Sequence, residues 1–593
     1  MLRFAPSPTG DMHIGNLRAA ILNFIIAKQK GEKFLIRIED TDMARNIDGA
    51  DKEILAILNL FGLFWDKLVY QSDNFKIHNE LAKQLIDKGE AFYCYATKEF
   101  LDKKRDEALA QKRAFRYDDA WAEVCKSENP NPAIRLRGDF SNDSSLQGES
   151  QDSLKQSTKT KIDCHDLANA KSRNDGVEDS HTPYISFIDE IKGECKFSQN
   201  EIDSFVIVRD DKIPTYNFAC AVDDMIYDIS FIIRGEDHTS NTPKQMLVHK
   251  KLGYTKEIKY AHLPIILNAE NKKMSKRENE SSVKWLLEQG FLPKAILNYL
   301  LLMGNNPPCE IFTLDEAIEW FDLSKLSKSP VRFDMSLLRH INREHLKRLS
   351  ENEMGLLLES SSKLLSQVAK DSSLLGESAE NSAESADSSL LGESAENSAE
   401  FADSSLRGRI ADSHEASVRS TDPHLQIHES KIDCHDLANA KSRNDDNVAN
   451  SIDSPKRVAN SPIYRKKTNA LCVFGALGKI FLEESSTLNE IRAKIERIFA
   501  PKILSDDFAP YSAEIAVLKS VLLDLVAHND ESLSDFNALK AKLGESCKID
   551  DKPLKGKGLF MPLRFLLTGA GNGPHLDILY PHLRAYLKDI LQC

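Results

Sequence analysis

At 593 residues the chain is too long for one compact domain, and about 150 residues per domain predicts three or four units. Hydrophobic residues make up 41% and charged residues 28%, which is ordinary for a soluble globular protein. No apolar run reaches the roughly 18 residues of a membrane span, the N-terminus shows no secretory signal, and the 10 cysteines form no CxxC pair. We therefore expect reduced thiols in a cytoplasmic protein with no membrane partner.

The net charge of −13 by itself argues against a nucleic-acid partner, because phosphate contacts need Lys and Arg. Residues 371–460 contain 18 acidic and 8 basic residues, however, and residues 141–182 contain 8 and 5. These two segments account for the whole excess, so the rest of the chain is neutral overall. Whole-chain charge therefore does not exclude RNA.

The same two segments read as inserts. The string KIDCHDLANAKSRND at 161–175 recurs at 431–445, and DSSLLGESAENSAE begins at Asp371 and again at Asp387. Such Ser-, Ala- and Glu-rich sequence buries too little apolar surface to offset the entropy of ordering, so we expect disorder. One Cys and one His per repeat also fall short of the four ligands of a structural zinc site.

The folded part opens with a βαβ pattern. Residues 3–5 form a short strand, apolar residues at helical spacing predict a helix over 16–28, and 34–38 is a second buried strand. Such a unit begins a parallel nucleotide-binding sheet, to which the strand-like runs 204–208 and 231–233 add further strands.

The second half of the chain reads as helical. From about Val283 onward the apolar spacing is helical, as at 295–303, 314–321 and 513–527. The sequence therefore predicts a mixed α/β first half and an all-helical second half.

The string PSPTGDMHIGN, residues 6–16, stands between the first strand and the first helix. This is where a doubly wound sheet binds nucleotides, and a helix N-terminus there suits phosphate. Gly10 and Gly15 allow a close backbone approach, and His13 offers a ring donor. A Pro/Gly turn that merely starts a helix is the alternative for an isolated HxGN.

The string KKMSKR, residues 272–277, follows an apolar run. Several cations on one short loop can neutralise the charge that builds on a leaving pyrophosphate. A solvated basic turn is an equal alternative for this string alone, but not for the two strings together.

The two strings resemble the signature sequences of class I aminoacyl-tRNA synthetases, and the motifs around them resemble the bacterial glutamyl branch of that family. These motifs are FLIRIEDTD at 34–42, PTYNFA at 214–219, Asp223-Asp224, IRGEDH at 233–238, NTPKQ at 241–245, GFLP at 290–293 and PLR at 562–564. Their order is the family's order, and the resemblance covers the chain apart from the two inserts.

The resemblance implies a Rossmann-type catalytic domain over 1–330, with an acceptor-binding insertion (about 72–195) and a stem-contact region (about 245–330). An all-α anticodon-binding region follows over 331–593. The predicted disordered inserts fall at 141–182 and 366–462.

It also implies a two-step reaction. Glutamate and ATP, with Mg²⁺ on the phosphates, give glutamyl-adenylate and pyrophosphate, and the terminal ribose of a tRNA then takes the acyl group. In the family, the first step usually waits for bound tRNA. The enzyme is expected to work as a monomer.

The family pattern assigns the site residues in three groups, with His13 and Lys276 as the catalytic pair. The residues expected to bind ATP are Pro6, Thr9, Gly10, His13, Gly15, Asn16, Lys273, Met274, Ser275, Lys276 and Arg277. The residues expected to bind glutamate are Arg3, Ala5, Ser7, Glu39, Tyr216, Cys220 and Arg234. Those expected to bind tRNA are Asn241, Thr242 and Lys244. The arginines would hold carboxylates and Glu39 the ammonium, with Asp237 nearby.

Four residues depart from the family pattern. Cys220 stands where the family has Asn. Cys94 lacks the second thiol of the CxC that holds zinc in some members, so no zinc is expected. Asp11 and Met12 replace bulkier, aromatic residues, which resembles the second glutamyl synthetase of bacteria that keep two copies. That second copy charges tRNA-Gln with glutamate, and an amidotransferase then forms glutamine.

Three alternatives fit less well. A truncated relative that glutamylates a base of tRNA-Asp lacks the anticodon-binding half, whereas this chain continues in helical sequence to Cys593. Glutaminyl synthetases carry a β-barrel second half. A non-catalytic tRNA-binding paralogue would not need His13 and Lys276.

Overall fold

The computed structural model describes residues 1–138, 184–275, 278–359 and 462–592. The disorder predicted at 141–182 and 366–462 lies outside these residues, apart from Pro462, and so do Lys276 and Arg277. The described residues up to 359 and from 467 to 592 lie in one compact unit, which holds the elements described below except for the first residues of α14. None of the helices in the described ranges is long and apolar enough to cross a membrane.

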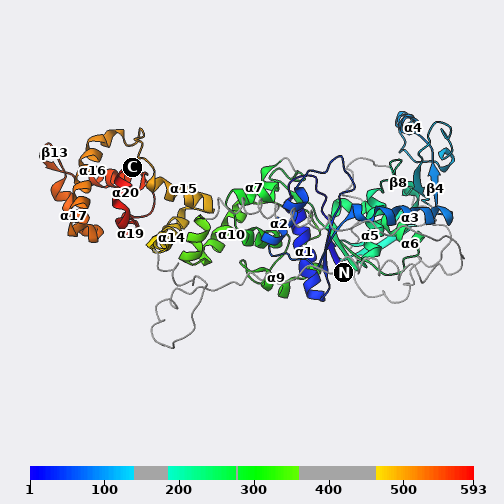
Figure 1. Cartoon of the computed structure of the whole chain (residues 1–593), viewed down its shortest axis with the longest axis horizontal. Helices are drawn as coiled ribbons and strands as arrows, with labels where there is room; N and C mark the ends of the chain where they lie inside the picture. The colour runs from blue at the N-terminus through cyan, green and yellow to red at the C-terminus, as the bar shows by residue number, and fades with distance from the viewer. Residues whose placement is uncertain (139–183, 276–277, 360–461, 593) are drawn as a thin grey trace, which may run out of the picture. The chain divides into compact units, whose positions relative to one another are not determined.

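A seven-stranded sheet forms the centre of the first half (Figure 1). Its order is β3 (Lys67–Tyr70), β2 (Phe34–Ile38), β1 (Leu2–Phe4), β9 (Phe231–Gly235), β10 (Lys259–Leu263), β6 (Tyr184–Asp189) and β7 (Gly193–Ser198). All neighbours pair in parallel except β6 and β7. The predicted α/β class and the strands at 3–5, 34–38 and 231–233 are confirmed.

The order of strands reverses at β1. The chain leaves β1 through helix α1 (Ile14–Lys30) to reach β2 on one side, whereas β9 pairs with β1 on the other side. The carboxyl ends of strands at such a switch point form the crevice in which open α/β sheets bind ligands. Arg3 on β1 and Arg234 on β9 stand near this crevice.

Helix α1 is buried over most of its length, which explains its almost continuous apolar sequence. It begins two residues before the predicted 16–28, because His13 caps its first turn, and it ends at Gly31 in the left-handed region with a φ of 63°. Asn23, fully buried, donates through Nδ2 to the carbonyl of Ile233 at 2.9 Å. This bond ties the helix to β9.

A second, smaller sheet contains β4 (Ala91–Cys94), β5 (Ala133–Leu136) and β8 (Phe205–Val208). The run at 204–208 is therefore a strand as predicted, but it pairs antiparallel with β5 and does not join the parallel sheet. Conversely, β6 and β7 fall inside the insertion predicted at about 72–195 and yet belong to the main sheet. The small sheet packs with α3 (Phe75–Asp87), α5 (Tyr216–Ile226) and α6 (Thr242–Leu252) around one apolar cluster.

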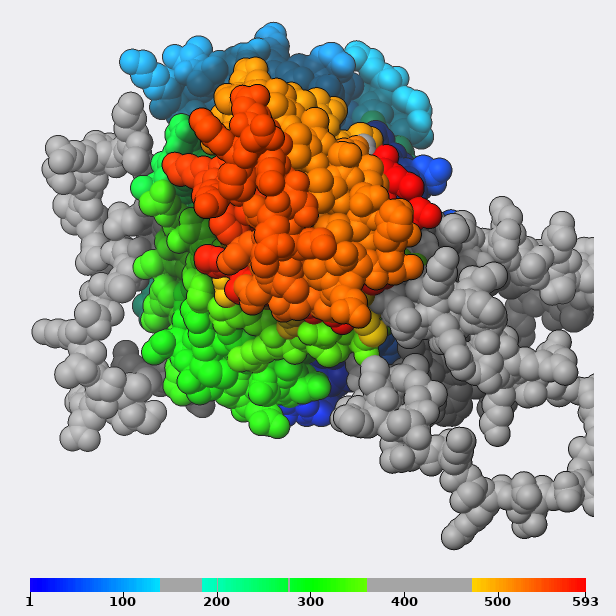
Figure 2. Space-filling view, turned by 90° about the vertical axis from the view of Figure 1, so that its left-hand side faces the viewer, coloured from blue at the N-terminus to red at the C-terminus, as the bar shows by residue number. Residues whose placement is uncertain are grey.

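The second half is helical, as predicted. Its helices are α7 (Val283–Glu288), α8 (Pro293–Leu302), α9 (Leu314–Trp320), α10 (Met335–Arg348), 351–359, α14 (Pro462–Phe481), α15 (Leu488–Phe499), α16 (Ser512–Ala527), α17 (Phe536–Ser546), α18 (Lys557–Thr568), α19 (Leu576–Leu583) and α20 (Leu587–Gln592). Two-residue strands interrupt them: β11 (Ile266–Leu267) pairs with β12 (Val331–Arg332), and β13 (Lys548–Ile549) pairs with β14 (Lys552–Pro553). Figure 2 shows the surface of the last helices in orange and red.

Two apolar clusters meet at α8. Leu292 and Ala295 belong to the cluster of the C-terminal helices, whereas Ile296 and Tyr299 belong to the cluster of the parallel sheet. Because these positions are three or four residues apart, one side of α8 contributes to both clusters.

Candidate active site

The first signature string occupies the crevice at the end of β1. Gly10, with a φ of 135°, adopts a conformation that side chains rarely tolerate. The N–H of Glu39 donates to the carbonyl of Pro6 at 2.9 Å, which joins this loop to the end of β2. Ser7 and Asn16 are exposed, while Ala5, Thr9 and Gly15 are half-buried.

His13 caps helix α1. Its Nδ1 accepts the N–H of Gly15 at 3.0 Å, so the neutral ring carries its proton on Nε2. The ring is thereby fixed at the positive end of a 17-residue helix. A phosphate placed at this helix end meets an Nε2–H donor and backbone N–H groups.

The second signature string begins with a tight turn after β11. Asn268 accepts the N–H of Lys272 through its side chain at 3.0 Å, and the backbone of Leu267 bridges to Lys273. Met274 is 4% exposed and anchors the loop in the apolar cluster below the sheet. Ser275 is exposed, and the predicted catalytic Lys276 follows outside the described residues.

The flanks of the two signature strings contact each other. His13 pairs with Ser282 in an antiparallel bridge, and Val283 donates its N–H to the carbonyl of Met12 at 3.0 Å. Ser282 also donates through Oγ to Asp11 at 3.2 Å. The structure therefore holds Ser282 and Val283, which follow the second signature string in the sequence, beside the start of α1.

Arg3 reaches the crevice from β1 with a partly engaged guanidinium. The side chain is almost buried, and its Nε donates to Asp224 Oδ1 at 3.1 Å. Its two terminal nitrogens have no hydrogen-bond partner among the described residues. Arg37 donates to the same Asp224 oxygen at 2.6 Å. Burial alone would raise the pKa of Asp224, but the two guanidinium groups outweigh it and lower this pKa to about 2.

Glu39 lies at the end of β2 and uses only one of its oxygens. Oε1 accepts from Arg37 Nη2 at 3.1 Å and from the thiol of Cys220 at 3.0 Å. Oε2 has no hydrogen-bond partner within the described ranges. One carboxylate oxygen therefore remains for a cation, in the same buried ion network as the Arg3 guanidinium.

Arg234 is engaged more fully than Arg3. Its Nη1 donates to Gln245 Oε1 at 2.9 Å, and its Nη2 donates to Thr242 Oγ1 at 2.7 Å. Its Nε lies 3.2 Å from Nε2 of His262, whose Nδ1 lies 2.6 Å from Asp189. Burial lowers the pKa of His262, so the neutral ring donates to Asp189 and accepts from Arg234. Three of the five N–H groups of a guanidinium are thus taken by the protein.

Tyr216 stands at the start of α5 and faces His238. Burial first, and then the nearby Glu39 carboxylate, raise the pKa of Tyr216 well above its ordinary value, so the phenol stays protonated. The Tyr216 hydroxyl donates to His238 Nδ1 at 3.1 Å. The same nitrogen accepts a hydrogen bond from Asn241 Nδ2 at 3.3 Å.

The three residues predicted to contact tRNA occupy different environments. Asn241 and Lys244 are half-buried, and the Lys244 ammonium lies 5.7 Å from the centre of the Phe205 ring. Thr242 has 0% exposure and serves Arg234, so the described conformation offers its side chain to no RNA. The contact of Thr242 with tRNA stays a prediction.

The ion network around Arg37, Asp223 and Asp224 carries no predicted role from the sequence. All three side chains are essentially buried. Arg37 is the sequence signal that could have indicated this network, since a charged residue inside a buried apolar strand requires charged or polar partners. Burial lowers the pKa of Arg37, but the carboxylates of Asp224, Glu39 and Asp223 together raise it well above its ordinary value.

Cys94, the remnant of the family's zinc motif, has an oxygen partner. Its Sγ lies 3.0 Å from the hydroxyl of the buried Tyr117. Across the described ranges no three His, Cys, Asp or Glu side chains gather in a metal-binding arrangement. The thiol and the phenol therefore hydrogen-bond to each other.

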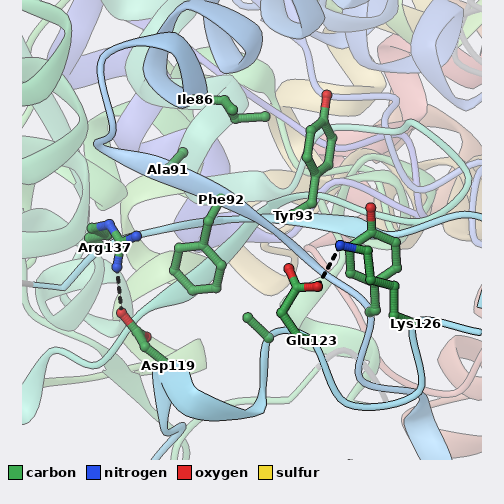
Figure 3. Close-up of a pocket in the computed structure, with 10 residues that line it drawn as sticks. Ile86, Ala91, Phe92, Tyr93, Asp119, Glu123, Lys126 and Arg137 are labelled. Atoms are coloured by element: carbon green, nitrogen blue, oxygen red, sulfur yellow. Dashed lines mark hydrogen bonds and ion pairs between the residues drawn. The ribbon is translucent and has the colours of Figure 1, made fainter.

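A pocket of about 360 Å³ lies in the insertion, away from the signature strings (Figure 3). Phe92 projects between two ion pairs, Arg137 with Asp119 at 3.1 Å and Lys126 with Glu123 at 2.6 Å. Because its cations and carboxylates neutralise each other and no predicted site residue lines it, this pocket is not the catalytic site.

Comparison with known families agrees with this geometry. A family model described as tRNA synthetases class I (E and Q), catalytic domain, matches residues 1–174 and 177–340. The chain belongs to this family of class I tRNA synthetases, which are specific for glutamate (E) or glutamine (Q).

Relatives that match over the full length of the chain indicate which reaction it catalyses. A Wolinella succinogenes protein named glutamate–tRNA ligase 2 is 44% identical over 100% of this chain and 99% of its own length. A Helicobacter hepaticus protein of the same name is 45% identical with the same coverage. A Helicobacter pylori protein named glutamylglutaminyl-tRNA synthetase is 40% identical, again over 100% and 99%. The chain is accordingly an ATP-dependent ligase that joins glutamate to tRNA in protein biosynthesis.

Solved structures share the fold. A glutamate tRNA ligase from Elizabethkingia meningosepticum, in complex with its amino acid, matches with a TM-score of 0.61 at 20% identity. The match covers 100% of this chain and 98% of that one. A glutamate-tRNA synthetase from Elizabethkingia anophelis matches with a TM-score of 0.60 at 20% identity, with the same coverage.

Proposed function

We propose that the chain binds glutamate between Arg3 and Glu39 and activates it at the N-terminus of α1. The observation that carries this proposal is the pair of incompletely used charges in one buried network. Arg3 has two terminal nitrogens, and Glu39 has one oxygen, without hydrogen-bond partners among the described residues. A guanidinium suits the carboxylate of the substrate, and a carboxylate suits its ammonium.

Tyr216 and Arg234 complete the pocket in this proposal. The remaining N–H groups of Arg234 supply a second, weaker contact to a carboxylate. Ala5 and Ser7 line the pocket from the loop after β1. Discrimination against glutamine follows from charge, since a neutral amide would leave a buried guanidinium unpaired.

ATP takes the crevice between the signature strings, and Pro6, Thr9, Gly10, Gly15 and Asn16 form its side on α1. In the first step a carboxylate oxygen of glutamate attacks the α-phosphorus, and the bond to pyrophosphate breaks. His13 donates from Nε2 to a phosphate oxygen, while Lys273, Lys276 and Arg277 meet the charge that grows on the leaving pyrophosphate. Met274 and Ser275 hold that loop in place.

Mg²⁺ is expected on the phosphates of ATP. The described residues hold no cluster of three or more acidic or imidazole ligands, which fits an ion that usually enters with the nucleotide phosphates and few protein ligands. When bound, the ion draws charge from the phosphoryl oxygens.

We further propose that the second substrate is tRNA-Gln. In the second step the terminal ribose hydroxyl attacks the activated carbonyl, and AMP leaves. Support comes from Asp11 and Met12 before His13 and from the name of the Helicobacter pylori relative. The product, glutamyl-tRNA-Gln, requires an amidotransferase as downstream partner. We also infer that the ligase acts as a cytoplasmic monomer, which sedimentation of the purified chain would test.

The test is to charge purified tRNA-Gln and tRNA-Glu separately with radioactive glutamate. We expect a higher kcat/KM with tRNA-Gln. Charging restricted to tRNA-Glu would contradict the choice of tRNA while leaving the glutamate pocket intact.

A further inference from the structure

One carboxylate oxygen of Glu39 accepts two hydrogen bonds, and one of the two donors is a thiol. Arg37 and the thiol of Cys220 both reach Oε1, at 3.1 Å and 3.0 Å. Because both donors fix the same oxygen, the carboxylate plane has a defined orientation, and Oε2 is the oxygen that remains for a substrate. The rotamer of Glu39 thus depends on Cys220 as well as on the ion pair.

Cys220 is buried too deeply to act on the substrate directly. Cys220 is 1% exposed, as little as the residues of the hydrophobic core. Burial, followed by the neighbouring Glu39, raises the pKa of the Cys220 thiol well above its ordinary value. The sulfur therefore keeps its proton and donates a hydrogen bond to Glu39, where a thiolate would repel the carboxylate.

Gln71 continues this contact toward the insertion. Its Nε2 lies 2.8 Å from Asp223 Oδ2 and 3.8 Å from Cys220 Sγ, and the side chain has 0% exposure. Gln71 begins η1 (Gln71–Asn74), the short turn that leads into α3.

Asp223 is held on the insertion side by two further side chains. Asn74 donates to Asp223 Oδ1 at 3.0 Å, and His78 Nε2 lies 2.7 Å from the same oxygen. Asp223 has 0% exposure, and a buried carboxylate needs such donors. The position of Gln71 is thus fixed by a carboxylate that η1 and α3 surround.

From these contacts we propose that Cys220 and Gln71 are positioning residues for glutamate binding: Cys220 orients Glu39 so that Oε2 faces the substrate ammonium, and Gln71 fixes Cys220. The inference rests on the proposed role of Glu39. It replaces the direct substrate contact expected of Cys220 with an indirect one, and it adds Gln71, which no motif indicates.

The experiment uses full-length variants in aminoacylation assays that vary glutamate and ATP separately. Cys220→Ala is expected to raise the KM for glutamate roughly tenfold, as expected for loss of one hydrogen bond to a charged group, with little change in the KM for ATP. Cys220→Ser, which keeps a donor, is expected to restore the KM to within about threefold. Gln71→Met is expected to raise the same KM by a smaller factor.

Cys547→Ala is the matched control. Cys547 also has 0% exposure, but it lies in the core of the C-terminal helices. Its truncation is expected to leave both KM values unchanged, which separates loss of a donor at Glu39 from the general effect of removing a buried sulfur.

A double-mutant cycle with Glu39→Gln distinguishes this inference from the function on which it rests. Glu39→Gln alone is expected to raise the KM for glutamate, and adding Cys220→Ala is expected to raise it no further. If Glu39→Gln raises the KM but Cys220→Ala does not, or if the two effects multiply in full, the positioning role is wrong. If Glu39→Gln itself changes nothing, the proposed glutamate site is wrong.

Discussion

His13 and Ser282 form a backbone bridge that brings the two signature segments together. His13 caps the helix that would receive the phosphates, and Ser282 stands shortly after the basic string at 272–277. The bridge therefore fixes the residues that follow the basic string beside the start of α1. The proposed mechanism, in which both signature strings act on one nucleotide, requires this proximity.

Lys276 is predicted to act on the phosphate-transfer step. Lys276→Ala is expected to lower kcat by about 10²–10³-fold, the usual loss when one charge-stabilising group is removed. Lys272→Ala is the control on the same loop, because the exposed Lys272 pairs with Glu270 at 2.8 Å. Rapid-quench measurement of adenylate formation separates this step from transfer. Unchanged turnover of Lys276→Ala would remove that residue from the mechanism.

Arg3 and Arg234 are predicted to respond differently to the same substitution. Arg3→Met is expected to raise the KM for glutamate by about 10–150-fold, equivalent to one charge-assisted bond of about 1.5–3 kcal/mol.

Arg234→Met is expected to act mainly on stability, since it leaves buried acceptors on Gln245 and His262 without their donor. Each such acceptor costs about 1–3 kcal/mol. Tm values and glutamate KM values of both variants provide the comparison. A larger rise in KM for Arg234→Met than for Arg3→Met would reverse the assignment.

Local patterns sufficed for the first βαβ unit, because short-range apolar spacing determines β1, α1 and β2. They did not suffice for β8, whose apolar run predicts a strand but whose partner, β5, is fixed by pairing distant in sequence. The same holds for the site. The signature strings were visible in the sequence, whereas the network of Arg3, Arg37 and Asp224 joins three elements.

Thr242 illustrates what a sequence motif does not show. Its place in a family motif suggests contact with tRNA, but only the fold reveals that its hydroxyl is buried against Arg234. Exposure depends on how α6 packs on the sheet, which no motif encodes. Cys220 is similar, since its bond to Glu39 follows from the packing of α5 against β2.

His345 is predicted to make stability depend on pH. It lies 2.9 Å from Asn298 Oδ1, and burial, followed by Arg348 and Lys294, lowers its pKa from 6.5 to about 4. Between these values the unfolded chain binds a proton that the folded chain does not, so stability falls as pH falls from about 6.5 to about 4.

The measurement compares Tm at pH 7 and pH 4.5 for the wild type and for His345→Gln, which cannot titrate. We expect the free energy of unfolding obtained from these melting curves to fall by on the order of 1–2 kcal/mol more in the wild type than in the variant, after allowance for partial solvent screening. Equal losses would show that His345 protonates freely in the folded state.

Residues 371–460 are predicted to be dispensable for activation. Their composition predicts no packed core, and doubling the length of a loop costs only about 0.6 kcal/mol. The deletion variant is therefore expected to keep its rate of adenylate formation within about threefold, while its tRNA affinity can change. A folded deletion variant that no longer activates glutamate would refute this.

The most direct test of the account is ATP–pyrophosphate exchange driven by glutamate, measured with and without tRNA, in the wild type and in Arg3→Met. We predict exchange with glutamate when tRNA is present, none with glutamine or aspartate, and recovery of the Arg3→Met variant only at much higher glutamate concentration. Exchange that is absent with glutamate under both conditions, or that proceeds equally well with glutamine, would contradict a site built around a guanidinium and a triphosphate.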